Sequence, residues 1–118
     1  MTRLMSDDYG VVATPVFRLT LKKLCVFLGR KYGSKNAAST REAIKLRIAQ
    51  LAASPYSAPV SERLAALGFT DYRQLLIDQH NLVYYRVDDQ NRKVVLVIAM
   101  DSCQSIEQLL YETTIMLE

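Results

Sequence analysis

The first third of the chain repeats apolar residues with the period of a helix. Between Phe17 and Tyr32 they recur every three or four residues, which places them on one helix face. The pair Thr14-Pro15 is typical of a helix start, and Gly33 of a helix end. We therefore predict a helix whose buried stripe consists of Phe17, Leu21, Leu24, Leu28 and Tyr32.

A second helical stripe follows at Ile44, Ile48 and Leu51, and Pro55 ends it. The spacing of Ser39-Thr40-Arg41-Glu42 fits a capping box, although the helix can also begin earlier, near Ser34. Two adjacent amphipathic helices joined by a short turn predict an α-hairpin.

The period then changes to that of β-strands. Residues 72–77, 82–87 and 93–100 each read as a strand, and their short connections predict an antiparallel meander. The last of the three is apolar on both faces, so we place it in the centre of the sheet. Residues 10–13 are short and β-branched and predict an edge strand.

Helical signals return at two further points. Residues 61–67 predict a short helix closed by Gly68, and Ser105 with Gln108 has capping-box spacing. The stripe of the last helix is Ile106, Leu109, Leu110 and Met116. The predicted fold class is α+β: an antiparallel twisted sheet of three to four strands, an N-terminal α-hairpin packed on it and a C-terminal helix.

Composition agrees with one globular domain over residues 1–118, with residues 1–9 expected to be flexible. Of the 118 residues, 50% are hydrophobic and 23% are charged, as in ordinary soluble proteins. The longest apolar run, Val94–Met100, is far shorter than the roughly 20 residues of a membrane helix. With two cysteines and no secretory signal pattern, we expect a reduced, cytoplasmic protein.

The net charge of +3 conceals an uneven distribution. Residues 1–60 hold ten Lys/Arg and three Asp/Glu, a net +7, whereas residues 61–118 hold five and nine, a net −4. A basic half favours an acidic partner or a nucleic-acid backbone, but a solvated helix face explains it equally well.

Signatures of enzyme chemistry are sparse. The glycines are scattered, and a single His with two distant Cys predicts neither a metal site nor a cofactor site. Tyr72, Tyr84 and Tyr85 share the strands with Arg73 and Arg86, a combination that can stack bases and hold phosphates. Strand alternation puts Tyr84 and Arg86 on the face opposite Tyr85, so at most half of this group can form one site.

Several phrases resemble the RelE/ParE superfamily of bacterial type II toxins. They are YRQLLIDQHNLVYYRVDD, KVVLVIAMDS and SIEQLLYE, preceded by LKKLCVFLGRKYG and LAASPYSAP in the helical part. The resemblance runs from about Val11 to Glu112. It implies a growth-inhibiting toxin, often involved in plasmid stabilisation, that a cognate antitoxin neutralises by covering it in a hetero-oligomer. The basic hairpin suits a negatively charged amphipathic segment of such a partner.

The family has two branches of different chemistry. RelE-like members cleave mRNA on the ribosome without a metal, using basic residues on the sheet and near the C-terminus. ParE-like members are not nucleases and bind DNA gyrase through a protein surface. The nuclease candidates that the resemblance offers in this chain are Arg73, His80, Arg86 and Tyr111.

That nuclease set is incomplete. Leu82 stands at the start of the second meander strand, where RelE-type enzymes often carry a catalytic arginine. After the third strand, where they carry a basic residue, this chain has Asp101-Ser102-Cys103-Gln104. Arginine is frequent in the family at the position of Cys103. Cys103 is therefore either a natural divergence or a detoxifying change.

Our leading hypothesis is a ParE-like toxin that inhibits DNA gyrase and has no enzymatic activity of its own. Its expected target contacts are Arg73, Arg86, Asp101, Cys103 and Gln104. The first alternative is a RelE-like, ribosome-dependent mRNA endonuclease. The second is an inactivated toxin that acts only as an antitoxin-binding module.

Overall fold

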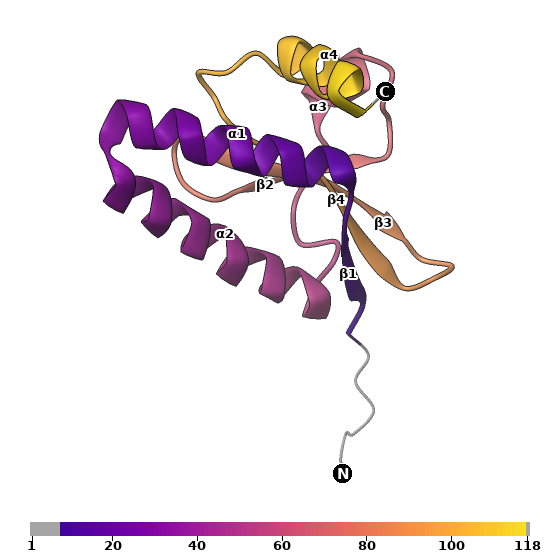
Figure 1. Cartoon of the computed structure of the whole chain (residues 1–118). Helices are drawn as coiled ribbons and strands as arrows, with labels where there is room; N and C mark the ends of the chain where they lie inside the picture. Colours follow the sequence, from indigo (N-terminus) through magenta and orange to yellow (C-terminus); the bar gives the residue numbers. More distant parts are fainter. Residues whose placement is uncertain (1–7, 118) are drawn as a thin grey trace.

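A computed structural model describes residues 8–117, with side chains to residue 113 (Figure 1). Residues 1–7 and the side chain of Met116 lie outside the described part. The elements in chain order are β1 (Gly10–Ala13), α1 (Pro15–Tyr32), α2 (Ser34–Ala53), α3 (Glu62–Ala66), β2 (Tyr72–Leu76), β3 (Asn81–Asp88), β4 (Lys93–Asp101) and α4 (Ile106–Leu117). No helix of the described residues is long and apolar enough to cross a membrane.

The α-hairpin begins and turns where the sequence indicates. The Thr14 hydroxyl caps α1 by accepting the Phe17 N–H at 3.1 Å, and Pro15 occupies the first turn. Gly33 separates the two helices at φ +95°, a conformation that favours glycine. Because α2 begins at Ser34, the earlier of the two possible starts is correct, and the Ser39 motif lies inside the helix.

The described sheet has the strand order β1-β4-β3-β2 (Figure 1). The antiparallel meander of β2, β3 and β4 and the central place of β4 are confirmed. The expectation of an antiparallel sheet needs one correction, because β1 runs parallel to β4. The α-hairpin separates β1 from the meander in the chain, and a four-residue strand carries no sign of its direction.

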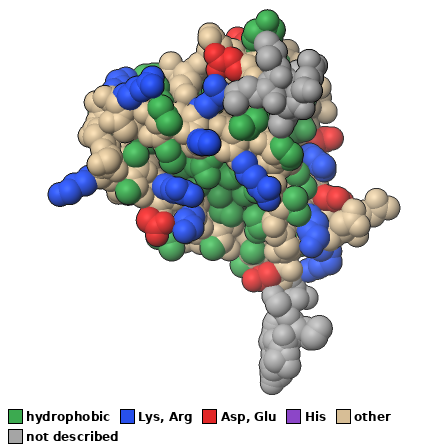
Figure 2. Space-filling model, viewed as in Figure 1, with side chains coloured by type: hydrophobic (Ala, Val, Ile, Leu, Met, Phe, Trp, Pro, Cys, Tyr) green, Lys and Arg blue, Asp and Glu red, His purple; other side chains and the backbone are tan. Residues whose placement is uncertain are grey.

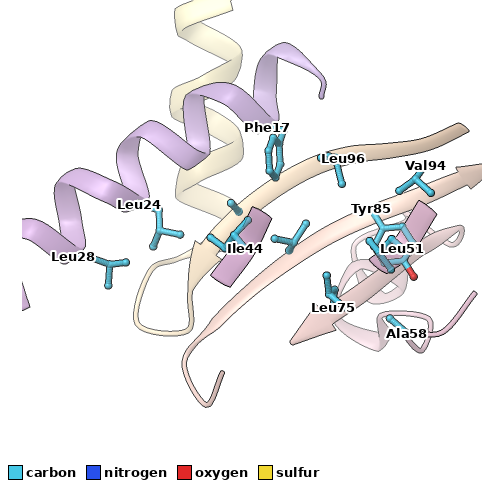
Figure 3. Packing of buried hydrophobic residues seen from close by; sticks show 12 residues of the cluster. Phe17, Leu24, Leu28, Ile44, Leu51, Ala58, Leu75, Tyr85, Val94 and Leu96 are labelled. Carbon is cyan, nitrogen blue, oxygen red and sulfur yellow. The ribbon is translucent and has the colours of Figure 1, made fainter. Parts of the chain in front are cut away.

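The sheet divides the core into two halves, one on each face, and a β-bulge in β4 determines which residues point to each face. Tyr84 pairs with Ile98, but Tyr85 pairs with Leu96, so Val97 is an extra residue on β4. On one face, Phe17, Leu24, Leu28, Ile44 and Leu51 of the hairpin pack on Val83, Tyr85 and Leu96 (Figure 3). On the other face, Ile106 and Leu109 of α4 pack with Leu64 of α3 on Leu82, Tyr84, Ile98 and Met100.

The hairpin stripe therefore faces the sheet as predicted, except at its end. Leu21 is partly buried, whereas Tyr32 is 51% exposed and does not belong to the core. Just before β1, the Tyr9 N–H donates a 2.8 Å hydrogen bond to the Ala52 carbonyl near the end of α2.

Thr14, which caps α1, and Thr20 within α1 continue the hydrogen bonding of β4 where β1 ends. The Thr14 N–H and hydroxyl both donate to the Leu96 carbonyl, at 3.2 and 2.8 Å. Further along, the buried Thr20 hydroxyl accepts the Ala99 N–H at 3.0 Å and donates to the Phe17 carbonyl. These hydrogen bonds fix the position of α1 along the length of β4.

We expect Thr20→Val to destabilise the protein by about 1–3 kcal/mol, because it keeps the side-chain volume but leaves the buried Ala99 N–H without an acceptor. Urea unfolding measures the effect. The matched control is Thr113→Val, since that buried hydroxyl only donates to carbonyls of its own helix. Equal losses in the two variants would contradict the role given to Thr20.

Candidate functional site

Two of the predicted site residues meet at the outer edge of β2. Arg73 and Arg86 both line a shallow hollow with Tyr56 and Asp71. Arg73 Nη1 donates to the Ala58 carbonyl at 2.6 Å, and its guanidinium lies 4.8 Å from the centre of the Tyr56 ring. Arg73 is therefore partly engaged in holding the α2–α3 loop against the sheet edge.

A carboxylate beside this hollow accepts two tyrosine hydroxyls. Asp89, in the β3–β4 turn, accepts a hydrogen bond from the Tyr9 hydroxyl at 2.6 Å and another from the Tyr56 hydroxyl. Arg92 covers the Tyr9 ring at 4.7 Å, as Arg73 covers that of Tyr56. The cluster joins three remote segments, and the sequence reasoning missed it because no spacing motif connects them.

Hydrogen bonding controls ionisation in this cluster. The bond to Asp89 favours the neutral phenol and raises the pKa of Tyr56 to about 12. The same bond to Asp89 raises the pKa of Tyr9. The hydrogen bond from the Tyr56 hydroxyl and, to a smaller extent, that from the Tyr9 hydroxyl lower the pKa of the Asp89 carboxyl. At neutral pH the cluster therefore holds one negative charge between two arginines.

The remaining predicted contacts lie at the opposite end of the sheet. Asp101 ends β4, is buried and accepts the Cys103 N–H at 2.8 Å. Gln104 accepts the Asp101 N–H on Oε1 at 2.9 Å. The His80 carbonyl accepts the Ser102 N–H at 2.6 Å, and Cys103 Sγ lies 3.8 Å from Lys31 Nζ.

The register of the sheet separates these two groups. Arg73 pairs across the sheet with Tyr85 of β3, whereas Asp101 pairs with Asn81, four residues away on the same strand. At 3.3 Å per residue that is about 13 Å. The five predicted target contacts therefore form two groups rather than one site.

The nuclease candidates are dispersed as well. Arg73 and Arg86 share the hollow at the edge of β2, and His80 lies in the turn at the far end of that strand. Tyr111 is on α4 and 69% exposed. Within the described residues, no three His, Cys, Asp or Glu side chains gather as a metal site either.

A groove of about 610 Å³ lies between α1 and α4, and it is larger than the hollow beside Arg73. A salt bridge of 3.2 Å between Lys23 and Glu112 joins its two walls. Its apolar lining includes Val26, which is 50% exposed, Phe27 and Leu109. Its cationic lining is Lys22, Lys23, Arg30 and Lys31.

Charge on the hairpin extends beyond this groove. Together α1 and α2 carry nine Lys/Arg and one acidic residue, Glu42. Figure 2 shows hydrophobic side chains gathered over the hairpin with Lys and Arg side chains around them. The basic half was visible in the sequence, but the contribution of α4 to a groove was not, because it depends on how α4 crosses α1.

Comparison with known proteins places the fold. The chain matches no protein-family model and no curated protein. Among solved structures it is similar to the toxin–antitoxin complex RelBE2 from Mycobacterium tuberculosis, with 17% identity, a TM-score of 0.55, and coverage of 82% of this chain and 94% of that one. The chain has the RelE toxin fold.

A mutant of the E. coli toxin RelE in its free state shows the same likeness. The identity is 18%, the TM-score is 0.54, and the match covers 94% of this chain and 99% of that one. The predicted RelE/ParE-like architecture is thus confirmed. At these identities the likeness concerns the fold, so activity has to be argued from the surface.

We expect Asp89→Asn to lower the pKa of Tyr56 from about 12 towards the ordinary tyrosine value, because the charged acceptor is removed. Titration of the phenolate absorbance in the folded protein measures this. Asp88→Asn is the control, since Asp88 accepts a hydrogen bond from Asn91 instead. An unchanged titration curve in Asp89→Asn would show that the two hydroxyls are not bound to this carboxylate.

Proposed function

We propose that the chain is the toxin of a type II toxin–antitoxin system. The fold supports this, because both similar structures are described as toxins and one is a toxin–antitoxin complex. Either an active or an inactivated toxin would retain the surface that its antitoxin covers.

The groove between α1 and α4 is the proposed docking surface for the antitoxin. Its apolar floor fits the apolar face of an amphipathic segment. Its cations other than Lys23, which already pairs with Glu112, fit carboxylates on the edges of that face. An acidic amphipathic helix therefore matches the groove in both shape and charge. Binding would bury Val26 and Phe27, which the chain alone leaves partly open to solvent.

For the target, we favour a ParE-like mode in which the toxin binds DNA gyrase and performs no chemistry itself. The observation behind this choice is the separation of the nuclease candidates into unconnected places. Cleavage of RNA needs positive charge converging on one phosphate. His80 and Tyr111 do not join Arg73 and Arg86 in lining the hollow at the edge of β2.

One observation favours the RelE-like alternative. Arg73, Arg86 and Tyr56 line the same hollow, and a basic hollow with an aromatic ring suits a nucleotide. Under this alternative the chain would cut mRNA on the ribosome. The third possibility, an inactivated toxin, keeps the groove and lacks both activities.

Purified protein added to DNA gyrase with supercoiled plasmid is expected to give linear, gyrase-linked DNA, while mRNA on translating ribosomes stays intact. Cut mRNA with undisturbed gyrase would reverse the assignment in favour of the hollow at Arg73 and Arg86. An effect in neither assay, together with normal growth when the protein is expressed, would leave the inactivated toxin.

Charge reversal in the groove tests the antitoxin surface separately. Lys22→Glu with Arg30→Glu is expected to weaken binding of the cognate antitoxin by about 10-fold at low salt, and less at high salt. Co-purification and calorimetry measure the affinity. The control is Lys35→Glu with Arg41→Glu, which makes the same change of net charge at two exposed cations of α2 that do not line the groove. Equal loss in the control would indicate general charge attraction instead of docking in the groove.

A further inference from the structure

A second hollow lies under the turn of the α-hairpin, at the end of the sheet away from Arg73. It has a volume of about 360 Å³ and is bordered by the end of α1, the start of α2, the β2–β3 turn and the end of β4. Its lining includes Leu28, Tyr32, Thr40, His80, Asn81 and Asp101.

Two residues that line this hollow each have a buried oxygen atom that lacks a hydrogen-bond donor among the described residues. The two atoms are Asn81 Oδ1 and Asp101 Oδ2. Asn81 is 5% exposed and Asp101 is 1% exposed. The two residues are direct cross-strand partners on β3 and β4, so their side chains stand next to each other on the hairpin face.

The other polar atoms of the pair are satisfied, and this fixes their orientation. Asn81 Nδ2 donates to both oxygens of Asp78, at 3.1 and 2.9 Å, so the amide oxygen is the atom without a donor. Asp101 Oδ1 accepts the Cys103 N–H. A buried acceptor without a donor is costly, and here two of them lie side by side.

We propose that this hollow binds the guanidinium group of an arginine side chain supplied by a partner protein. The group has to donate hydrogen bonds, because both unpaired atoms are acceptors, and a cationic donor is favoured, because one of them belongs to a carboxylate. A guanidinium presents a planar fork of N–H donors and is more weakly hydrated than an ammonium, so it loses less on entering a nearly buried site.

The surroundings of the hollow favour this occupant. The half-exposed ring of Tyr32 stands at its border, with Lys31 Nζ 5.5 Å from the ring centre, and a guanidinium can stack on the ring in place of Lys31. A metal ion fits less well, because the described residues gather no set of three His, Cys, Asp or Glu ligands. A nearby cation of this chain is Lys31, which lies 3.8 Å from Cys103 Sγ and interacts more weakly with Asp101. Lys31 is therefore the competitor within the chain.

Titration of the full-length chain with N-acetyl-L-arginine amide, followed by amide NMR shifts, tests the inference. We expect saturable shifts of Asn81, Asp101 and Ser102 with an affinity in the millimolar range. The neutral citrulline analogue, which has the same shape, should produce none of them. This outcome does not depend on toxicity or on the target, so failure here leaves the proposed function untouched.

Substitutions test whether binding depends on the buried carboxylate and on the competing lysine. Asp101→Asn keeps the shape and removes the charge, and it should weaken binding at least 10-fold. The control is Asp88→Asn, which alters a carboxylate in the β3–β4 turn and should change nothing. Lys31→Met, an exposed position, should strengthen binding by removing the competing cation.

The inference is overturned if the shifts do not saturate, if citrulline binds as arginine does, or if Asp101→Asn binds as well as the unchanged chain. Should Asp101→Asn fail to fold, the citrulline comparison and Lys31→Met decide the matter, because neither disturbs the buried pair.

Discussion

The fold depends on satisfying the outer edge of β4, a strand that is much longer than its neighbour β1. Beyond Leu96, the edge of β4 that faces away from β3 has no strand beside it within the described chain. Side chains replace the missing strand: Thr20 accepts the Ala99 N–H, and Gln104 accepts the Asp101 N–H. A buried backbone N–H needs such an acceptor, so α1 and the segment before α4 are both positioned by the same strand. The groove between α1 and α4 is a consequence.

The bulge on β4 decides which face each residue reaches. Leu96 and Asp101 are five positions apart, and in a regular strand they would point to opposite faces. The extra residue at Val97 restores both to the hairpin face. Without it, Asp101 would meet α4 instead of lying beside Asn81 beneath the hairpin turn. A single irregularity in the ladder thus creates the hollow with its two unpaired acceptors.

Much of this architecture could be predicted from the sequence, because helix periods, the Thr14-Pro15 start and the glycine turn are local signals. The direction of β1 could not, since parallel pairing depends on where the hairpin returns the chain. The candidate functional site was harder to predict than the fold. Alternation correctly separated Tyr84 from Tyr85, but it does not give the position of a residue along the length of the sheet, which puts Asp101 about 13 Å from the level of Arg73. The Asp89 cluster joins residues from three distant segments, and no local pattern marks it.

The segregation of charge gives the molecule an electric dipole, with the hairpin at its positive end. Nine cations against one anion on two adjacent helices create a potential that extends about a Debye length, roughly 8 Å at physiological salt, into solvent. An anionic partner is attracted and turned towards the hairpin before the surfaces touch. Encounter rates for such a partner rise, while cationic proteins are repelled from the same side. The hairpin therefore favours anionic partners through their rate of association, before any side chains are in contact.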